Sequence, residues 1–208
     1  MFILSRADID ELADSILADF RDKCPTRMGP IDIERLATDY LGLHVDYETL
    51  SEDGSVLGVT AYAPCTLYTQ HALIDLGPNT VLLDRCLFPK EDESPSLVGR
   101  RRFTIAHECA HQILYRYESA VAQMEICKPY ACRESFSLRE LKTYEDWNEW
   151  QADALGASLL MPKDLIKRVV FSFCSGEKLV RYGNRVSAET YGWAKDISRF
   201  LKVSYTAL

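Results

Sequence analysis

The stretch "FTIAHECAHQILYR", residues 103–116, holds two of the four histidines of the chain, with a glutamate directly after the first. In an α-helix, residues four positions apart lie on one face with Cβ atoms about 5–6 Å apart, so His107 and His111 can direct ring nitrogens at one ion. Glu108 lies about 100° further round the helix, where its carboxylate can reach a water molecule beside the ion without binding the ion. The spacing predicts two metal ligands and a catalytic base. The alternative is a pair of helix-face histidines satisfied by water.

The surroundings of this motif favour a helix from about residue 96 to about residue 117. Ser94 is a suitable cap, and Pro95 suits the first turn of a helix. Apolar residues recur at helical spacing, at Phe103, Ala106, Ala110, Ile113, Leu114 and Tyr117. Because this apolar stripe borders the histidine face, we expect the site at the edge of a core, partly shielded from water. Cys109 points elsewhere on the helix and is not counted as a ligand.

A third ligand is needed, because catalytic zinc commonly takes three protein ligands and leaves the fourth position for water. The best candidate is Glu149 in "NEWQAD", on a helix predicted over residues 144–161 and ended by Pro162. Asp153 lies one turn later on the same face and can accept the free N–H of His107 or His111, which would orient the ring. Small residues would let this helix approach the first one closely, at Ala152, Gly156 and Ala157.

Other readings of these acids stay open. Glu149 and Asp153 can be ordinary solvated carboxylates. Glu145 and Asp146 are weaker candidates for the third ligand, since acids at a helix start are favoured by the helix dipole in any case.

The rest of the chain predicts an α+β fold, in which a small, mostly antiparallel or mixed sheet packs against helices. Amphipathic patterns predict helices over residues 7–23, 31–40, 163–173 and 188–201. Strand patterns cover residues 43–50, 55–63, 66–76 and 80–84. Residues 119–143 are less regular, and we expect a loop over the site or a short helix there, with Cys127 and Cys132 as loop thiols.

The length of 208 residues suits a single domain spanning 1–208. We divide it into N-terminal helices with a first strand (1–50), the sheet (51–90), the zinc-site helices (94–162) and C-terminal helices (163–208).

Composition narrows the compartment and the partners. A formal net charge of −7 gives no general attraction to phosphate backbones, so direct nucleic-acid binding is not expected. The run Arg100 to Arg102 is the strongest basic cluster, and such a run is more often a solvated helix face. The seven cysteines are odd in number and form no C-x-x-C pair, which argues against a disulfide framework. With no evident signal peptide and no apolar run near ~18 residues, we expect a reduced, cytoplasmic protein without a membrane segment.

At this point the chain resembles a known family. "RRRFTIAHECAHQILYR" together with "EWQADALGASLLMP" is similar to the ImmA/IrrE-type metallo-endopeptidases, and H-E-x-x-H followed by E-x-x-x-D is similar to the gluzincin group of zinc peptidases. The resemblance is strongest over residues 102–162. It implies a zincin-like fold and one Zn²⁺ per chain, held by His107, His111 and Glu149, with Glu108 as the catalytic base. Family members often cut a helix-turn-helix repressor, which implies a protein substrate of that kind.

Some features depart from the family pattern. Ala110 stands where the family often has glycine, and the stretch between His111 and Glu149 is longer than usual. The last residues, "ISRFLKVSYTAL", resemble a family segment that usually continues into another helix.

These observations together predict a zinc-dependent endopeptidase. A group that stabilises the tetrahedral oxyanion is also expected, and the candidates are Tyr115, Tyr144 and His71, although His71 on a predicted strand suits a structural role better. The main alternative is a non-catalytic, zinc-containing binding module that holds a repressor or toxin partner. A DNA-associated regulator and a zinc hydrolase of another kind are further alternatives.

Overall fold

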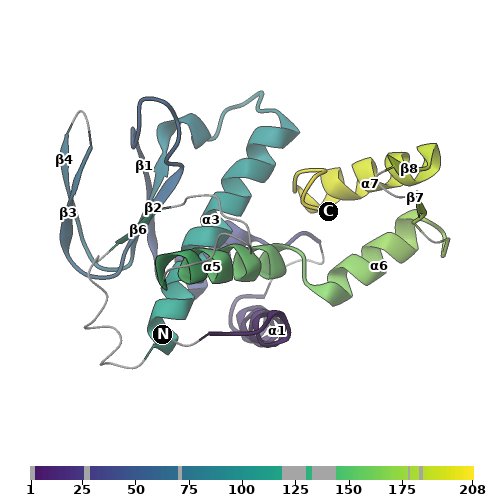
Figure 1. Ribbon diagram of the computed structural model, residues 1–208, viewed down its shortest axis with the longest axis horizontal. Helices are drawn as coiled ribbons and strands as arrows, with labels where there is room; N and C mark the ends of the chain where they lie inside the picture. Colours follow the sequence, from purple (N-terminus) through teal and green to yellow (C-terminus); the bar gives the residue numbers. More distant parts are fainter. Residues whose placement is uncertain are drawn as a thin grey trace.

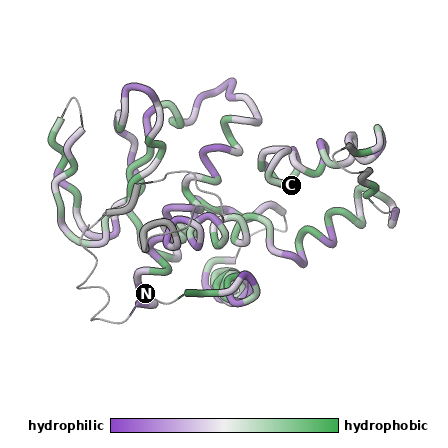
Figure 2. Tube along the Cα trace, in the orientation of Figure 1, coloured by the Kyte–Doolittle hydropathy of each residue, from purple (hydrophilic) through white to green (hydrophobic). Residues whose placement is uncertain are grey.

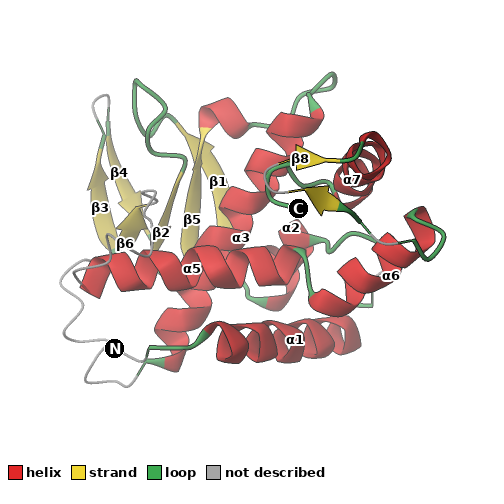
Figure 3. Ribbon diagram, turned by 45° about the vertical axis from the view of Figure 1, so that its right-hand side comes forward, coloured by secondary structure: helices red, strands yellow, loops and turns green. Residues whose placement is uncertain are grey.

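The computed structural model describes residues 3–25, 29–69, 72–118, 130–132, 144–177, 179–182 and 185–208. Its central element is helix α3 (Pro95–Tyr117), which packs on the main sheet and on helix α5 (Tyr144–Leu160). Helix α1 (Arg6–Lys23) lies along α5 (Figure 3). The helices predicted over residues 7–23, 96–117 and 144–161 are confirmed, with ends shifted by one residue each.

Helix α1 forms because its ends are capped and one face is apolar. Ser5 and Asp8 make reciprocal side-chain to backbone hydrogen bonds at the start of the helix. The buried face consists of Ile9, Ala13, Ile16, Leu17 and Phe20. Asp10 ties α1 to the end of α5, because its carboxylate accepts from Ser158 Oγ at 2.7 Å and from Lys163 Nζ at 2.8 Å.

The main sheet has four strands in the order β1 (His44–Glu48), β5 (Thr80–Asp84), β2 (Gly58–Ala61) and β6 (Tyr130–Cys132). β1 runs parallel to β5, and the other two pairings are antiparallel. The sheet is therefore mixed, which confirms the predicted fold class. Strand β6 was not predicted from the sequence.

Alternate residues of the sheet face two different layers. Val81 and Leu83 belong to the large core with the helices, whereas Leu82 packs in a smaller cluster on the other face. On β2, Thr60 faces α3, where Gln112 Nε2 donates to its Oγ1 at 2.7 Å and to the carbonyl of Ala61 at 3.0 Å. These bonds fix α3 against the sheet.

Two predicted elements differ from the structure. The run over residues 66–76 was predicted as one strand, but it forms the antiparallel pair β3 (Cys65–Tyr68) and β4 (Leu73–Leu76). The helix predicted over residues 31–40 begins later, as α2 (Ile33–Arg35), because the Asp32 carboxylate accepts from the Arg35 N–H at 3.2 Å and caps it. It continues as a π-helical turn, η1 (Leu36–Tyr40), and a short 3-10 turn, η2 (Arg85–Leu87), follows β5.

The C-terminal elements lie at the end of the molecule opposite to strands β1–β6 (Figure 1). Helices α6 (Lys163–Phe173) and α7 (Ala188–Leu201) confirm the predicted helices, and the short pair β7 (Arg181–Tyr182) and β8 (Arg185–Val186) was not predicted. Apolar and polar residues alternate along α6 in Figure 2, as expected of an amphipathic helix.

The expectation of a solvated basic face on α3 is wrong. Arg100 is exposed, but Arg101 and Arg102 are only 5% and 7% exposed. The C-terminal segment packs so closely on this part of α3 that a Cβ added at Gly99 would lie 3.0 Å from the backbone N of Ser204. Long-range packing has therefore buried a run that looks like a surface cluster in the sequence.

Two further observations concern the cysteines and the apolar length of the helices. The thiols of five cysteines are free, at Cys24, Cys65, Cys86, Cys109 and Cys174. No helix in the described part of the chain is long and apolar enough to cross a membrane.

Candidate metal centre

Three side chains from α3 and α5 converge on one buried point. His107 Nε2 lies 3.3 Å from Oε2 of Glu149, and His111 Nε2 lies 3.2 Å from Oε1 of the same carboxylate. The two Nε2 atoms are 3.0 Å apart, and all three residues are buried. The structure thus brings together the three residues that the sequence analysis selected as ligands of one ion.

The donor atoms and their spacing fit a zinc ion. Ligand atoms around a tetrahedral zinc, with bonds of about 2.0–2.1 Å, lie about 3.3–3.4 Å from one another. The separations in the cluster, from 3.0 to 3.3 Å, are close to that value. Two imidazoles with one carboxylate are a common ligand set for catalytic zinc, whereas Mg²⁺ and Ca²⁺ prefer oxygen ligands. The cluster can therefore hold a divalent metal ion.

Asp153 orients one of the two histidines. Its Oδ1 atom lies 2.9 Å from Nδ1 of His107. A carboxylate can only accept here, so the ring proton of a neutral His107 sits on Nδ1 and the lone pair of Nε2 faces the cluster. The sequence left open which histidine Asp153 would contact, and the structure selects His107.

The pKa values of the three cluster residues are shifted by burial and by their mutual contacts. Burial lowers the pKa of His107, but the hydrogen bond to Asp153 and the contact with Glu149 outweigh it and raise that pKa to about 9. Burial raises the pKa of Glu149, yet the two histidines lower it to about 2. Burial lowers the pKa of His111. Positive charge beside the carboxylates of Asp153 and Glu149 is therefore favourable. A proton on His107 provides one such charge, and a divalent ion bound to the cluster would provide two.

The carboxylate of Glu108 lies against strand β2, at a position where only glycine fits. Glu108 is fully buried on the side of α3 that faces the sheet. A Cβ added at Gly58 would lie 2.5 Å from Oε1 of Glu108 and 2.8 Å from Cγ2 of Thr104. Gly58 therefore makes the room that this carboxylate occupies between α3 and β2.

Tyr62 was missed by the sequence analysis. The residue follows β2, its ring stacks on that of Tyr115 with centroids 4.3 Å apart, and its hydroxyl is hydrogen-bonded to Asn148. Burial, and then the negative charges of Glu108 and Glu149, raise the pKa of the Tyr62 hydroxyl well above its usual value. The Tyr62 phenol therefore stays protonated and can act as a hydrogen-bond donor. The alternation of Gly58 and Thr60 toward α3 predicts that Tyr62 faces the same way.

The other candidates for oxyanion stabilisation are placed differently. Tyr115, on α3, contributes the second ring of the stack with Tyr62. Tyr144 is the first residue of α5, but its side chain, like those of Glu145 and Asp146, lies outside the described residues. His71 is also outside them, as is most of residues 119–143, including Cys127; Cys132 ends β6.

The close approach of α5 to α3 sets the position of Glu149. A Cβ added at Gly156 would lie 3.1 Å from the backbone C of Ala106 and 3.1 Å from the backbone N of His107. Ala152, one turn earlier, is fully buried. These small residues let the helices meet at the level of the cluster, as the sequence analysis expected.

A mixed sheet packed on a His-Glu-x-x-His helix, with a carboxylate from a second helix beside the histidines, defines the zincin-like class of fold. Comparison with known families makes the assignment specific. Residues 84–208, more than half of the chain, match the family model Peptidase_M78, described as the IrrE N-terminal-like domain, and the chain belongs to that metallopeptidase family. A comparison with curated proteins gave no match.

Proposed function

We propose that this protein is a zinc-dependent endopeptidase, with His107, His111 and Glu149 as metal ligands. The observation that carries the proposal is the convergence of two imidazoles and one carboxylate at 3.0 to 3.3 Å in a buried, acid-rich position. Membership of a metallopeptidase family supports the same chemistry. Asp153 has a positioning role, because it holds the His107 ring in the orientation that binding requires.

The side chains around the cluster can divide the work of peptide hydrolysis. A bound zinc ion supplies Lewis acidity, which polarises the scissile carbonyl and acidifies water. Glu108 takes a proton from the attacking water and later passes it to the leaving amine. Tyr62 donates its hydroxyl proton in a hydrogen bond to the oxygen of the scissile carbonyl as negative charge develops there. Glu108 is fully buried, so its carboxylate interacts with neighbouring charges more strongly than it would in water.

The proposed substrate is a protein of the helix-turn-helix repressor type. This part of the proposal rests on the resemblance of the motif segments to the ImmA/IrrE-type endopeptidases. The net charge of −7 favours a protein substrate over direct contact with nucleic acid.

The test combines metal analysis with a cleavage assay on a mixture of quenched fluorescent peptides. The wild-type chain should carry one zinc and cleave the peptides. Glu149→Ala should lose the metal, because a three-ligand site loses one ligand. Glu108→Gln should keep the metal and cleave about 10²–10⁴ times more slowly, since it loses only the base. Glu11→Gln, at an exposed position of α1, is the matched control and should behave as wild type.

Each arm can contradict a separate part of the proposal. Unchanged zinc content in Glu149→Ala would remove that residue from the ligand set. Full activity in Glu108→Gln would remove the base. A wild-type chain that binds zinc and cleaves neither the peptides nor a repressor partner would favour the alternative, a non-catalytic binding module.

A further inference from the structure

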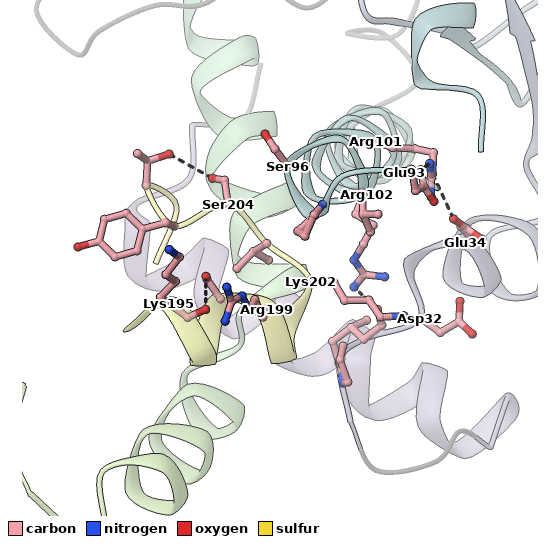
Figure 4. A pocket seen from close by; sticks show the side chains of 18 residues that line it. Asp32, Glu34, Glu93, Ser96, Arg101, Arg102, Lys195, Arg199, Lys202 and Ser204 are labelled. Carbon is pink, nitrogen blue, oxygen red and sulfur yellow. Dashed lines mark hydrogen bonds and ion pairs between the residues drawn. The ribbon is translucent and has the colours of Figure 1, made fainter. Parts of the chain in front are cut away.

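A second group of buried polar side chains lies in the N-terminal part of α3. The metal cluster, by contrast, includes His107 and His111 further along the same helix. This second group borders a cavity of about 980 Å³ (Figure 4). Three segments form the walls: residues 30–34, residues 93–102 at the start of α3, and residues 195–206 at the end of α7 and beyond. Nothing in the peptidase chemistry uses this cavity.

The cavity is basic within an acidic protein. Five cationic side chains line it, against three acidic ones, whereas the whole chain carries −7. Arg101 is neutralised by a two-pronged ion pair with Glu93, in which Nη2 lies 2.8 Å from Oε1. The remaining cations are Arg102, Lys195, Arg199 and Lys202. Arg199 forms an ion pair with Asp196, with Nη1 3.2 Å from Oδ1. In the described part of the chain, neither Lys195 nor Lys202 has an ion-pair partner, so these two lysines leave positive charge on this wall uncompensated.

Arg102 is the strongest sign of a missing anion. Arg102 is only 7% exposed to solvent. Its Nη2 donates a hydrogen bond to the carbonyl of Ile31 at 2.6 Å. Its Nε is buried without a hydrogen-bond partner, and no carboxylate of the described residues forms an ion pair with it. Burial lowers the pKa of its guanidinium. The negative charges of Glu34 and Asp32 oppose this shift but form no direct ion pair with the guanidinium, so an anion bound in the cavity would offset part of the cost of burying it.

The backbone around the cavity adds to the positive charge of the wall, and it also fixes the shape of the cavity. The N-terminus of α3, a helix of 23 residues, opens on the cavity at Ser96 and carries partial positive charge. Ser94 caps the helix by accepting from the N–H of Leu97. Gly99 lets the chain near Ser204 press onto the first turns of α3, because a Cβ there would lie 3.0 Å from the Ser204 N. The basic groups are thus mounted on tightly packed elements.

Part of the remaining lining is apolar and suits an organic group. Pro30, Val98 and Val203 line the cavity, together with Tyr205. The ring of Tyr205 packs edge-on against that of Tyr191, with centroids 5.3 Å apart. A ligand with a charged end and a ring or hydrocarbon portion would use both parts of the wall.

We propose that this cavity binds a phosphate-bearing small molecule, and that cationic side chains of its lining, Arg102 among them, hold the phosphate. Guanidinium groups match the oxygens of phosphate in a two-pronged manner, and a cavity lined by several cations suits a doubly charged group. The concave shape favours a small molecule over a polymer, and the overall negative charge disfavours a nucleic-acid backbone. The phosphate can come from free inorganic phosphate or from a nucleotide, and the experiment separates the two.

The test is calorimetric titration of the full chain at constant ionic strength with inorganic phosphate and with adenosine monophosphate. Arg199→Ala combined with Lys202→Ala should weaken binding at least about tenfold, because two exposed cations of the wall are removed. The matched control, Lys90→Ala combined with Lys167→Ala, removes two exposed positive charges outside the lining and should leave binding unchanged. Both pairs concern exposed side chains, so folding should persist, whereas Arg102→Met carries a risk of unfolding and serves only as a supporting variant.

The outcomes are distinct. Adenosine monophosphate binding more tightly than phosphate identifies an organic phosphate, and equal binding identifies free phosphate; both support the proposal. No heat of binding up to about 10 mM ligand, or equal loss in the control pair, overturns it. Tighter binding of a DNA duplex or of polyglutamate also overturns it, since the occupant would then be a polymer. None of these results depends on the metal centre, because Glu149→Ala should titrate as wild type.

Discussion

Helix α3 carries two buried polar groups of opposite electrostatic character. Around His107 and His111, in its C-terminal half, the neighbouring side chains are acidic: Glu108, Glu149 and Asp153. Around Arg102, in its N-terminal half, the excess charge is positive. Each half is buried by different elements, with α5 and β2 over the first and residues 30–34 and the C-terminal segment over the second.

The comparison shows that burial alone does not decide what a polar cluster does. In both halves the described side chains leave charge that the chain does not neutralise, which makes a bound ion favourable in each. The sign of the excess decides the ligand: a cation in the acidic half and an anion in the basic half. Only the acidic half of α3 could be predicted from a sequence motif.

The largest effect should come from filling the space beside Glu108. Gly58→Ala places a Cβ 2.5 Å from Oε1 of Glu108, and the flexible carboxylate is the group that moves most easily. Peptide cleavage should fall about 10²–10⁴-fold while zinc content and phosphate binding stay unchanged, because the ligands and the basic half are untouched. Turnover measured beside metal analysis checks this. Gly77→Ala is the control, since its Cβ would lie 3.8 Å from Thr80 Oγ1, an ordinary contact. Equal activities of the two variants would contradict the assigned place of the base.

Tyr62→Phe tests the oxyanion role and should lower kcat about 10²–10³-fold, because a donor to the developing charge is lost. Zinc content should not change. Tyr115→Phe retains the stacked ring pair and should have a much smaller effect. If Tyr115→Phe were the more damaging change, the roles of the two tyrosines would be reversed. Steady-state kinetics on one fluorescent peptide would distinguish them.

Removing the carboxylate behind His107 should act on metal affinity more than on the chemical step. We expect Asp153→Ala to weaken zinc binding about 10–100-fold, since the ring loses the acceptor that orients it. Competition with a chromophoric chelator measures the affinity. Asp164→Ala, on α6 and highly exposed, is the control. An unchanged affinity in Asp153→Ala would show that packing alone orients the ring.

The smallest effect should come from the close packing of α5 on α3 at Gly156, and it should be an effect on stability. In Gly156→Ala the new Cβ meets backbone atoms of Ala106 and His107 at 3.1 Å, and backbone cannot move aside as a side chain can. The free energy of unfolding should fall by about 1–3 kcal/mol. Gly192→Ala, on α7 with open space around the new Cβ, should instead gain up to about 1 kcal/mol from helix propensity. Urea unfolding of both metal-free variants checks the pair, and a gain in both would show that α3 and α5 have room to spare.

Local patterns predicted the elements that carry the site. Helix caps and apolar spacing place the starts and ends of α3 and α5 within one residue, because these signals act between residues a few positions apart. Patterns were less informative for residues 66–76, where the turn between β3 and β4 was not recognised, and for the short strands β6, β7 and β8.

The sequence by itself determined that His107, Glu108 and His111 share one region of a helix, since the 3.6-residue period leaves no other arrangement. The tertiary structure decided which carboxylate meets the imidazoles, that Gly58 lies beside Glu108 and that Tyr62 stacks on Tyr115. It also decided that Arg102, expected on a solvated face, is buried in a basic cavity. These outcomes depend on contacts between residues from 38 to 71 positions apart, and such contacts follow from how whole elements pack rather than from any local period.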